Sequence, residues 1–307
     1  MIFLWGLTGD GPFEAVRAAL QRRGAHVALI DQRLVLETGV EMDMDDRLHA
    51  TATVAGVRLS LDEARAAYWR TYDLLRVPAV VASEPHDLAV SAAVAVEEAL
   101  VVWLELSDGR ILNRPSNMAS NGSKPYQMEI LRAHGFEVPT TLVTTEPGAV
   151  RRFWTDSGAV IYKSVSGTRS VIARLTNAHL ARLNDVAWCP TQFQQYVPGV
   201  DHRVHVVGDD VFACEVICEA DDYRYGALHG QPPEIQAVAL PTDVAERCVT
   251  LANALGLRLA GIDLRHTPDG RWFCFEVNPS PGFTYYEAHT GQPIADAIAS
   301  DLANAPL

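Results

Sequence analysis

The sequence lacks any hydrophobic run long enough to cross a membrane. The longest candidate, residues 88–106, is interrupted by Glu97, Glu98 and Glu105, whereas a membrane-spanning helix needs about 20 predominantly apolar residues. The N-terminal stretch MIFLWGLTGD lacks the basic start and the small-residue cleavage site of a signal peptide, so it is predicted to form a first strand. We therefore expect a soluble protein with no membrane partner.

Cysteine and basic residues are both scarce. The five cysteines are odd in number and show no Cys-x-x-Cys spacing, which favours reduced thiols and a cytoplasmic location. Lysine and arginine total 25 against 38 acidic residues, for a formal net charge of -13. Broad nucleic-acid binding needs clustered cations, so it is not expected. A chain of 307 residues that is 48% hydrophobic can form two or three packed units.

The N-terminal third opens with a βαβ pattern: a strand over 2–7, a helix over 12–24 and a strand over 25–30. The glycines between the first two follow G-x-x-G-x-G, not the dinucleotide-binding spacing G-x-G-x-x-G. This spacing argues against dinucleotide binding, and a nicotinamide- or flavin-dependent oxidoreductase is kept as an alternative because the glycines still lie between a strand and a helix. A long helix is predicted over 87–105, and the Asn-, Ser- and Pro-rich residues 111–125 are typical of a connector.

The segment GIDLRHTPDGRWFCFEVN predicts a β-hairpin with strands over 261–266 and 271–278. An even-length loop would place His266 opposite Arg271 and Asp263 opposite Cys274. Alternation would then give one face to polar side chains, namely Asp263, Arg265, Glu276 and Asn278. The other face would carry the apolar set Ile262, Leu264, Phe273, Phe275 and Val277. One face is predicted to be core and the other to carry chemistry.

Two carboxylates and an amide oxygen on one patch are ligands that suit Mg²⁺, which also takes phosphate oxygens. The alternative is that Asp263 and Glu276 are solvated acids on a half-exposed sheet. Three further features favour phosphate: Lys163 among apolar neighbours in AVIYKSV, the turn Gly167–Ser170 after it, and Lys124 at the start of a helix. Either lysine alone could be an ordinary surface charge, but the combination indicates a phosphate site.

In this order the motifs resemble the ATP-grasp superfamily of carboxylate–amine ligases, in the branch of RimK-like glutamate ligases and of graspetide ligases, which crosslink ribosomal peptides. The matching stretches are SKPYQMEILRAHGFEVPTTLVTT, VIYKSVSGTRS, FQQYVPGVDHRVHVVGDDVFACEV, DDYR and GIDLRHTPDGRWFCFEVNPSPGF, within residues 111–290. The resemblance implies an ATP-grasp fold of α/β (α+β) class. Its parts would be an N-terminal βαβ pre-ATP-grasp domain over 1–112, a central subdomain over 113–190 and a C-terminal subdomain with the metal site over 191–307.

The resemblance also implies roles for individual residues. For the nucleotide, these are phosphate contacts from Lys124, Lys163, Gly167 and Arg169, an adenine-reading hinge of Gln194, Gln195, Tyr196 and Val197, and Asp201 near the ribose. Catalytic roles fall to Arg203, which would reach the phosphate in transit, and to Arg224 in DDYR. Asp263, Glu276 and Asn278 would hold one or two Mg²⁺ ions, with Mn²⁺ as a substitute. Ser280, Gly282 and Arg265 would lie on the substrate side.

The implied reaction is ATP-dependent amide formation. The enzyme would phosphorylate a carboxylate, and an amine would then displace phosphate from the acyl phosphate, which leaves ADP and phosphate. The partners would be ATP and a carboxylate and an amine from an amino acid or a peptide, and a homo-oligomer is compatible with the sequence. Two departures from the family pattern are Gln195, where glutamate is common, and the lone Gly167 in the phosphate loop. The alternative function is a non-catalytic ATP-binding regulatory module, whose sign would be a missing metal ligand, yet all three ligands are present.

Overall fold

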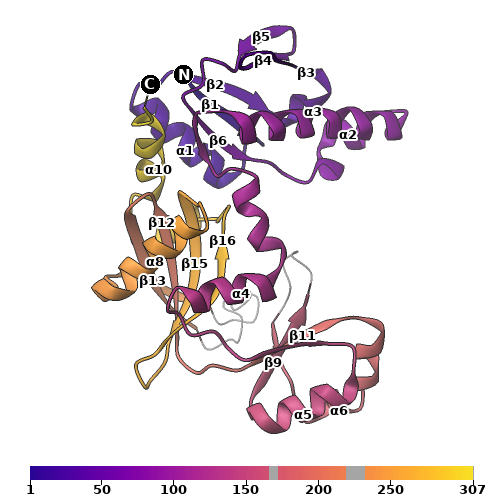
Figure 1. The fold of residues 1–307 in the computed structure, drawn as a ribbon, viewed down its shortest axis with the longest axis vertical. Helices are drawn as coiled ribbons and strands as arrows, with labels where there is room; N and C mark the ends of the chain where they lie inside the picture. The colour runs from indigo at the N-terminus through magenta and orange to yellow at the C-terminus, as the bar shows by residue number, and fades with distance from the viewer. Residues whose placement is uncertain (166–171, 219–231, 307) are drawn as a thin grey trace.

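The computed structural model describes residues 1–165, 172–218 and 232–306. Helices pack on four sheets, and the C-terminal end of the chain returns to the N-terminal part of the molecule (Figure 1). The predicted α/β (α+β) class is confirmed. Within the described residues, no helix combines the length and the apolar character that crossing a membrane requires.

The N-terminal part is built on a parallel sheet with the order β2-β1-β6-β7. Its strands are β1 (Ile2–Gly6), β2 (Val27–Asp31), β6 (Ala66–Arg70) and β7 (Arg110–Leu112). Helix α1 (Gly11–Arg22) connects β1 to β2, which confirms the βαβ prediction, and α3 (His86–Leu106) precedes β7. Asp10 caps α1, because its carboxylate accepts a hydrogen bond from the Phe13 N–H at 3.1 Å.

Every residue of β1 is buried, because the sheet is covered on both faces. Ile2 and Leu4 pack with α1 and with α10 (Ile294–Ala303), the last helix of the chain. Phe3 and Trp5 point the other way, towards Trp103 of α3. A continuous apolar strand is the pattern expected for a sheet covered on both sides. The first core therefore joins the two ends of the chain.

A small antiparallel sheet in the N-terminal part was not predicted. It consists of β3 (Thr38–Met44), β4 (Leu48–Val54) and β5 (Val57–Ser60). Its buried apolar positions are Ala50, Ala52 and Val54, and alanine is a weak strand former. The alternation in LHATATV is therefore easy to miss. The remaining short elements of this part are η1 (Gln32–Glu37), η2 (Leu74–Arg76) and α2 (Pro78–Val81).

The central part is a four-stranded sheet with the order β10-β9-β11-β8. The strands are β8 (Thr141–Thr144), β9 (Val160–Ser164), β10 (Ala173–Arg174) and β11 (Thr191–Gln195). One face packs on α5 (Pro147–Ser157), α6 (Asn177–Leu180) and η4 (Leu183–Trp188) through Val150, Leu183 and Phe193. The predicted boundary after residue 190 falls just before β11. Because β11 pairs within the central sheet, the chain passes to the next sheet at residues 196–199.

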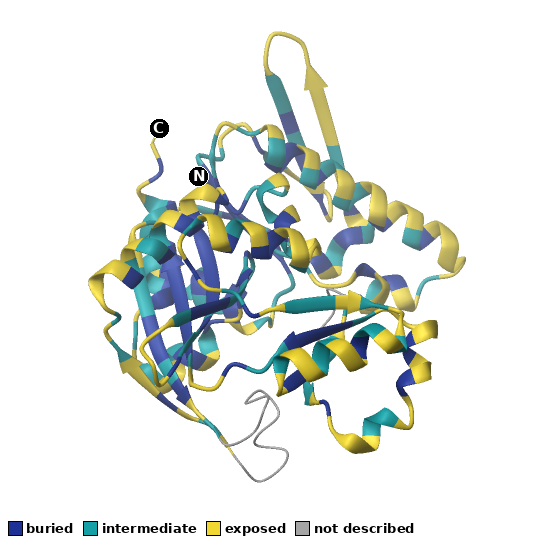
Figure 2. Cartoon of the chain, turned by 60° about the horizontal axis from the view of Figure 1, so that its bottom comes forward, coloured by how far each residue is buried: buried dark blue, intermediate teal, exposed yellow. Residues whose placement is uncertain are grey.

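The C-terminal part is an antiparallel sheet with the order β14-β13-β12-β15-β16. The strands are β12 (Val200–Val207), β13 (Asp210–Ile217), β14 (Glu234–Val238), β15 (Leu259–His266) and β16 (Trp272–Asn278). Helices α4 (Lys124–Ala133) and α8 (Thr242–Ala254) bury one face of it. Figure 2 shows that the buried residues gather in strands while the helices expose their outer sides. The segment η3 (Ser116–Gly122) leads into α4, and α9 (Thr284–Thr290) follows β16.

The β15–β16 hairpin has a different register from the predicted one. His266 lies opposite Trp272 and Leu264 opposite Cys274, and a bulge then brings Asp263 opposite Glu276. The loop is odd in length, so the even-loop pairing was wrong, and the bulge on β16 shifts the pairing by one more residue. Cys274 therefore belongs to the core, where burial raises its pKa well above the usual 9.0. Phe273 and Phe275 lie outside that core cluster.

Candidate active site

The face of the C-terminal sheet that α4 and α8 leave open carries ion pairs between neighbouring strands. On β12 and β15, Asp201 lies opposite Arg265 and Arg203 lies opposite Asp263. Arg265 donates to both carboxylate oxygens of Asp201, at 2.7 and 2.8 Å. Arg203 Nη1 donates to Asp263 Oδ1 at 2.6 Å. Directly opposed opposite charges stabilise the pairing of the two strands as well as fixing the side chains.

Glu276 and Asn278 continue this face onto β16. Glu276 lies opposite Asp263, and Asn278 lies opposite Gly261. Lys124, the first residue of α4, forms an ion pair with Glu276 and donates to Asn121 Oδ1 at 2.8 Å. The bulge beside Leu264 thus brings together the three predicted oxygen donors, with one cation held against each carboxylate.

Arg203 is buried, with a side chain that is 8% exposed. Gly261 makes room for it, because a Cβ at that position would collide with the Arg203 guanidinium and with Pro281. His205 follows Arg203 on the same face of β12 and accepts from Arg203 Nε at 3.4 Å. Burial, and then the charge of Arg203, lower the pKa of His205 well below 6.5. His205 is therefore a neutral spacer between Arg203 and the backbone of Gly282.

The predicted hinge joins the central sheet to the C-terminal sheet. Gln194 and Gln195 end β11, and Tyr196 and Val197 begin the link to β12. The N–H groups of Gln195 and Tyr196 donate to Thr140 O at 2.9 Å and Ala159 O at 2.8 Å. Arg265 Nη1 donates to the Val197 carbonyl at 2.9 Å. Several hinge groups are thus used by the fold itself, and Arg265 belongs to the hinge side of the site.

Lys163 lies on the face of the central sheet that is turned away from α5 and η4. Its partner across β9 and β11 is Gln192, which is 1% exposed. Tyr162 and Phe193, their neighbours, point into the helical side. Within the described residues, the side-chain oxygen Oε1 of Gln192 is buried without a hydrogen-bond partner. An unsatisfied buried oxygen is costly, so a polar ligand on this face would relieve it.

Lys124 and Lys163 are the only lysines in the sequence, and arginine fills every other position among the 25 Lys and Arg residues. Lysine and arginine differ in shape and hydration, with lysine acting as a compact point charge. The two lysines lie on different elements, α4 and β9. This compositional signal was available in the sequence and was not used in predicting the site.

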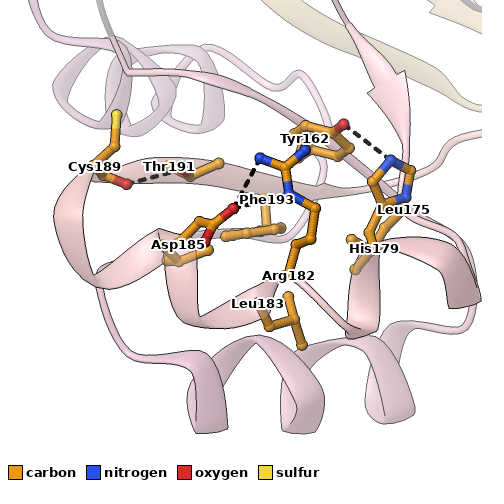
Figure 3. A pocket seen from close by; sticks show the side chains of 10 residues that line it. Tyr162, Leu175, His179, Arg182, Leu183, Asp185, Cys189, Thr191 and Phe193 are labelled. Carbon is orange, nitrogen blue, oxygen red and sulfur yellow. Dashed lines mark hydrogen bonds and ion pairs between the residues drawn. The ribbon is translucent and has the colours of Figure 1, made fainter.

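A pocket in the central part lies on the opposite face from Lys163. Figure 3 shows it between β9, β11, α6 and η4, with Tyr162 near His179 and Arg182 near Asp185. Tyr162 and His179 share a hydrogen bond of 3.2 Å, and Arg182 and Asp185 form an ion pair of 2.9 Å. Because side chains alternate along a strand, this pocket does not communicate with Lys163 and Gln192 through the sheet.

Three predicted site residues, Gly167, Arg169 and Arg224, lie outside the described residues. Ser280 and Gly282 follow Asn278 directly, and the Ser280 N–H donates to Asn278 Oδ1 at 2.9 Å. Arg265, predicted on the substrate side with them, donates to Asp201 and to the Val197 carbonyl of the hinge. The predictions did not place His205 beside Arg203, although alternation along β12 puts both side chains on the same face. They also missed Arg70 and Asn113, which no pattern in the sequence connects to residues 279–281.

Over residues 1–165, 172–218 and 232–306, no three His, Cys, Asp or Glu side chains come together as a metal cluster. The donor set here is two carboxylates and one amide oxygen. Such a set suits Mg²⁺, which keeps waters and phosphate oxygens in its coordination shell, and does not suit a metal that needs an all-protein cage. The residues therefore fit a magnesium ion that arrives with a phosphate ligand.

Comparisons with known proteins place this geometry in context. A family model described as a RimK-like ATP-grasp domain matches residues 122–302. A probable alpha-L-glutamate ligase of Rhodopirellula baltica is 30% identical over 211 residues, which are 65% of this chain and 51% of that protein. A beta-citrylglutamate synthase B of Danio rerio is 24% identical, over 87% of this chain and 67% of that protein. The chain thus spans about half to two thirds of these curated relatives.

Among solved structures, the ATP-grasp ligase PsnB, complexed with a phosphomimetic variant of its minimal precursor, Mg and ADP, is 26% identical with a TM-score of 0.81. That match covers 98% of this chain and 97% of PsnB. The macrocyclase MdnC of Microcystis aeruginosa, bound to precursor peptide MdnA, is 23% identical with a TM-score of 0.82, over 99% and 100% of the two chains. At that identity MdnC shows likeness of fold alone. These matches confirm the architecture expected from the sequence.

Proposed function

Since the chain belongs to the RimK-like ATP-grasp family, we propose that it is an ATP-dependent carboxylate–amine ligase that forms an amide bond through an acyl phosphate and releases ADP and phosphate. The observation that carries this proposal is the polar face on which Asp263, Glu276 and Asn278 meet, with Arg203 and Lys124 held against the two carboxylates. An oxygen-rich patch with two cationic side chains beside it suits a magnesium–phosphate ligand.

Asp263, Glu276 and Asn278 would hold one or two Mg²⁺ ions, and Mn²⁺ would substitute. In the ligand-free protein, Arg203 and Lys124 neutralise the two carboxylates. A divalent cation would take over that neutralisation and free both side chains for phosphate oxygens. When bound, the metal supplies charge stabilisation for the phosphoryl group in transit.

Lys124 and Lys163 would contact the phosphates from α4 and β9, with Gly167 and Arg169 of the phosphate loop beside them. Gln194 to Val197 would read adenine through the hinge groups that the fold leaves available, and Asp201 would stay near the ribose. Under this proposal the nucleotide lies between the central and C-terminal sheets. The division into residues 1–112, 113–190 and 191–307 belongs to the same proposal, with β11 counted in the central sheet.

The chain's own residues account for the chemistry of phosphoryl transfer. A carboxylate is a poor acyl donor until its oxygen carries a phosphoryl group, and catalysis of this transfer consists mainly of positioning and charge stabilisation. Arg203 is buried, and His205 would keep it on this face after the metal takes over Asp263, so it could meet the charge on the phosphoryl oxygens with little movement. Arg224 would assist by adding a second positive charge. Ser280 and Gly282 would border the incoming amine or carboxylate.

A peptide is the substrate class that the comparisons favour. The chain aligns with 97% of PsnB, which is complexed with its precursor, whereas the matches to glutamate ligases cover between 51% and 86% of those proteins. A carboxylate and an amine of a ribosomal peptide are therefore the proposed substrates, and a free amino acid is the second choice. The alternative function, a non-catalytic ATP-binding module, is disfavoured because all three proposed metal ligands share one face.

Self-association is proposed through α3. Its outward stripe of Leu88, Ala92, Ala95, Ala99, Val102 and Leu106 recurs at alternating intervals of four and three residues, the spacing of a helix–helix seam. In an antiparallel pair Leu88 meets Leu106 and Ala95 meets Ala99, so a second copy of the chain fits the stripe. Light scattering should give a dimer mass, and Ala95→Glu should give a monomer. A wild-type monomer would contradict this assignment.

The test of the ligase proposal is substrate-dependent ADP release. Peptides encoded beside the gene and free amino acids are incubated with ATP and Mg²⁺, with hydroxylamine in place of the amine. A ligase should form a hydroxamate together with ADP in equal amount. If the protein binds ATP but none of these carboxylates stimulates ADP release, the non-catalytic ATP-binding module would be favoured.

A further inference from the structure

The loop after β16 is held by residues from outside the C-terminal sheet. Arg70 Nη1 donates to the Ser280 carbonyl and to Ser280 Oγ, both at 3.0 Å, and to the Pro281 carbonyl at 3.3 Å. Asn113 Nδ2 donates to the Pro279 carbonyl at 2.6 Å. Three consecutive carbonyls of the loop therefore accept hydrogen bonds from the N-terminal part and the residue that follows it.

Arg70 is fixed from behind as well. It is the last residue of β6, and its Nε donates to Asp10 Oδ2 at 2.7 Å. Asp10 is the capping residue of α1, so its carboxylate is itself immobilised by the helix. A Cβ on Gly6 would collide with the Arg70 carbonyl and the Phe13 ring, so the close approach of β1, β6 and α1 requires glycine there. The Arg70 side chain is 20% exposed, and its geometry is set by the N-terminal part.

The loop in turn touches the proposed metal site. The Ser280 N–H donates to Asn278 Oδ1 at 2.9 Å, the oxygen assigned above to the metal. A hydrogen bond to one lone pair orients the amide and leaves the other lone pair for a cation. Arg70, Ser280 and Asn278 thus form a continuous chain of hydrogen bonds from the N-terminal sheet to a proposed metal ligand.

We propose that Arg70 is a positioning residue of the ligase: it fixes Ser280 and thereby the Asn278 amide oxygen, so that the N-terminal part sets the metal affinity of a site it does not touch. The inference rests on the proposed function for the identity of the metal site. Groups that orient metal ligands typically change metal affinity by about 10- to 100-fold when removed.

A structural tie between parts of the molecule is the competing explanation, and the chain supplies a control for it. Arg22 of α1 also joins the N-terminal part to the C-terminal end, through Asp296 of α10 at 3.1 Å. That ion pair lies on α10, away from the loop at 279–283. The shared core of α1, β1 and α10 keeps the parts together without either arginine. Arg22→Ala therefore removes a tie of the same kind without touching the loop.

The experiment combines two measurements on Arg70→Ala, Asp10→Asn and Arg22→Ala. Hydrogen–deuterium exchange reports on the loop, whose exchangeable amides are those of Ser280, Gly282 and Phe283 because positions 279 and 281 are proline. Calorimetry gives the Mg²⁺ concentration needed for half-maximal enhancement of ADP binding. Asp10→Asn keeps a good helix cap while removing the charge that holds Arg70, so it is informative even if Arg70→Ala folds poorly.

Arg70→Ala should speed exchange in the loop by about tenfold and raise the Mg²⁺ requirement by about tenfold, with metal-free ADP affinity unchanged. Asp10→Asn should show smaller changes in the same direction, and Arg22→Ala should match wild type. Equal effects in Arg22→Ala, or unchanged exchange and Mg²⁺ requirement in both Arg70→Ala and Asp10→Asn, would overturn the inference. Absence of ligase turnover in wild type would refute the proposed function only, since neither measurement needs turnover.

Discussion

The two sheets that bear the candidate site satisfy their polar residues in different ways. On the C-terminal sheet the charges are matched across strands, as Asp201 with Arg265 and Arg203 with Asp263. On the central sheet Gln192 is more deeply buried than these residues, at 1% exposed, and its side-chain oxygen has no hydrogen-bond partner among the described residues. The named charges of the C-terminal sheet therefore have partners without a ligand. On the central sheet, the buried oxygen of Gln192 has no hydrogen bond to offset the cost of its burial.

The two sheets illustrate two ways in which a ligand-free protein can hold polar groups for a ligand. Matched charges keep carboxylates and cations in place at little cost in stability, and a ligand must exchange one partner for another. An unmatched buried amide oxygen costs stability until a ligand supplies a hydrogen bond. Substitutions on the C-terminal sheet should therefore act on turnover and metal use, and those on the central sheet on nucleotide affinity.

The largest expected effect is on the C-terminal sheet. Asp263→Asn and Glu276→Gln should each lower kcat by about 100-fold or more. Each substitution weakens the binding of the Mg²⁺ ion that would stabilise the phosphoryl group in transit. Added Mg²⁺ should restore part of the loss, and metal-free ADP binding should change much less. Asp269→Asn, in the turn of the same hairpin, is the control. Normal activity of both variants at limiting Mg²⁺ would return these residues to the class of surface acids.

Lys163→Met tests the central sheet and should weaken ATP binding by about tenfold, since it removes one charge-assisted contact with phosphate. The fold should be kept, because a partly exposed lysine contributes little to stability. Calorimetric titration with ATP measures the loss. Because the chain has two lysines, reductive ¹³C-methylation also gives two side-chain signals by NMR, and both should shift on addition of Mg-ATP. Unchanged affinity and an unmoved Lys163 signal would remove this residue from the site.

Gln192→Met sharpens the comparison most, because it should move stability and binding in opposite directions. Removing the unpartnered oxygen should raise the free energy of unfolding by about 1 kcal/mol, and ATP affinity should fall by a few-fold if the amide meets the ligand. Gln194→Met is the matched control, since Gln194 already donates to Thr141 Oγ1 at 3.1 Å and its loss should destabilise. A destabilised Gln192→Met would mean that the amide is satisfied in the free protein.

The smallest effect concerns His205, whose pKa burial and the Arg203 charge hold well below 6.5. Below about pH 6.5 the unfolded imidazole takes up a proton that the folded one does not. Stability is therefore fully present above that pH and falls as the pH decreases towards the folded pKa. Urea unfolding between about pH 5 and 7.5 measures the slope. His205→Gln should flatten it, and an equal slope in the variant would refute this assignment.

The sequence predicts the βαβ opening, the long α3 and the hairpin of β15 and β16, because periodicity and turn residues act locally. The prediction from the sequence correctly places Asp263, Glu276 and Asn278 on one face of the hairpin, although the strand pairing that it used is wrong. The odd loop and the bulge between Asp263 and Leu264 are two departures from the simple pattern, and neither leaves a mark in the sequence.

Contacts between distant parts of the chain could not be predicted. Arg70 reaches Ser280 across 210 residues, and Asn113 reaches Pro279 across 166. The shared core of the N-terminal sheet, α1, Phe283 and α10 brings these partners together, and it forms only in the tertiary structure. The two-lysine signal, in contrast, was readable from composition and points to the same site.

The central claim is that a substrate carboxylate is activated as an acyl phosphate by transfer of the γ-phosphoryl group. It is tested most directly by ¹⁸O labelling of that carboxylate in a complete reaction with ATP, Mg²⁺ and the amine. Its phosphorylated oxygen leaves with the phosphate when the amine attacks, so one ¹⁸O atom should appear in each phosphate released, with ADP as the nucleotide product. Unlabelled phosphate, or AMP with pyrophosphate in place of ADP, would contradict the account.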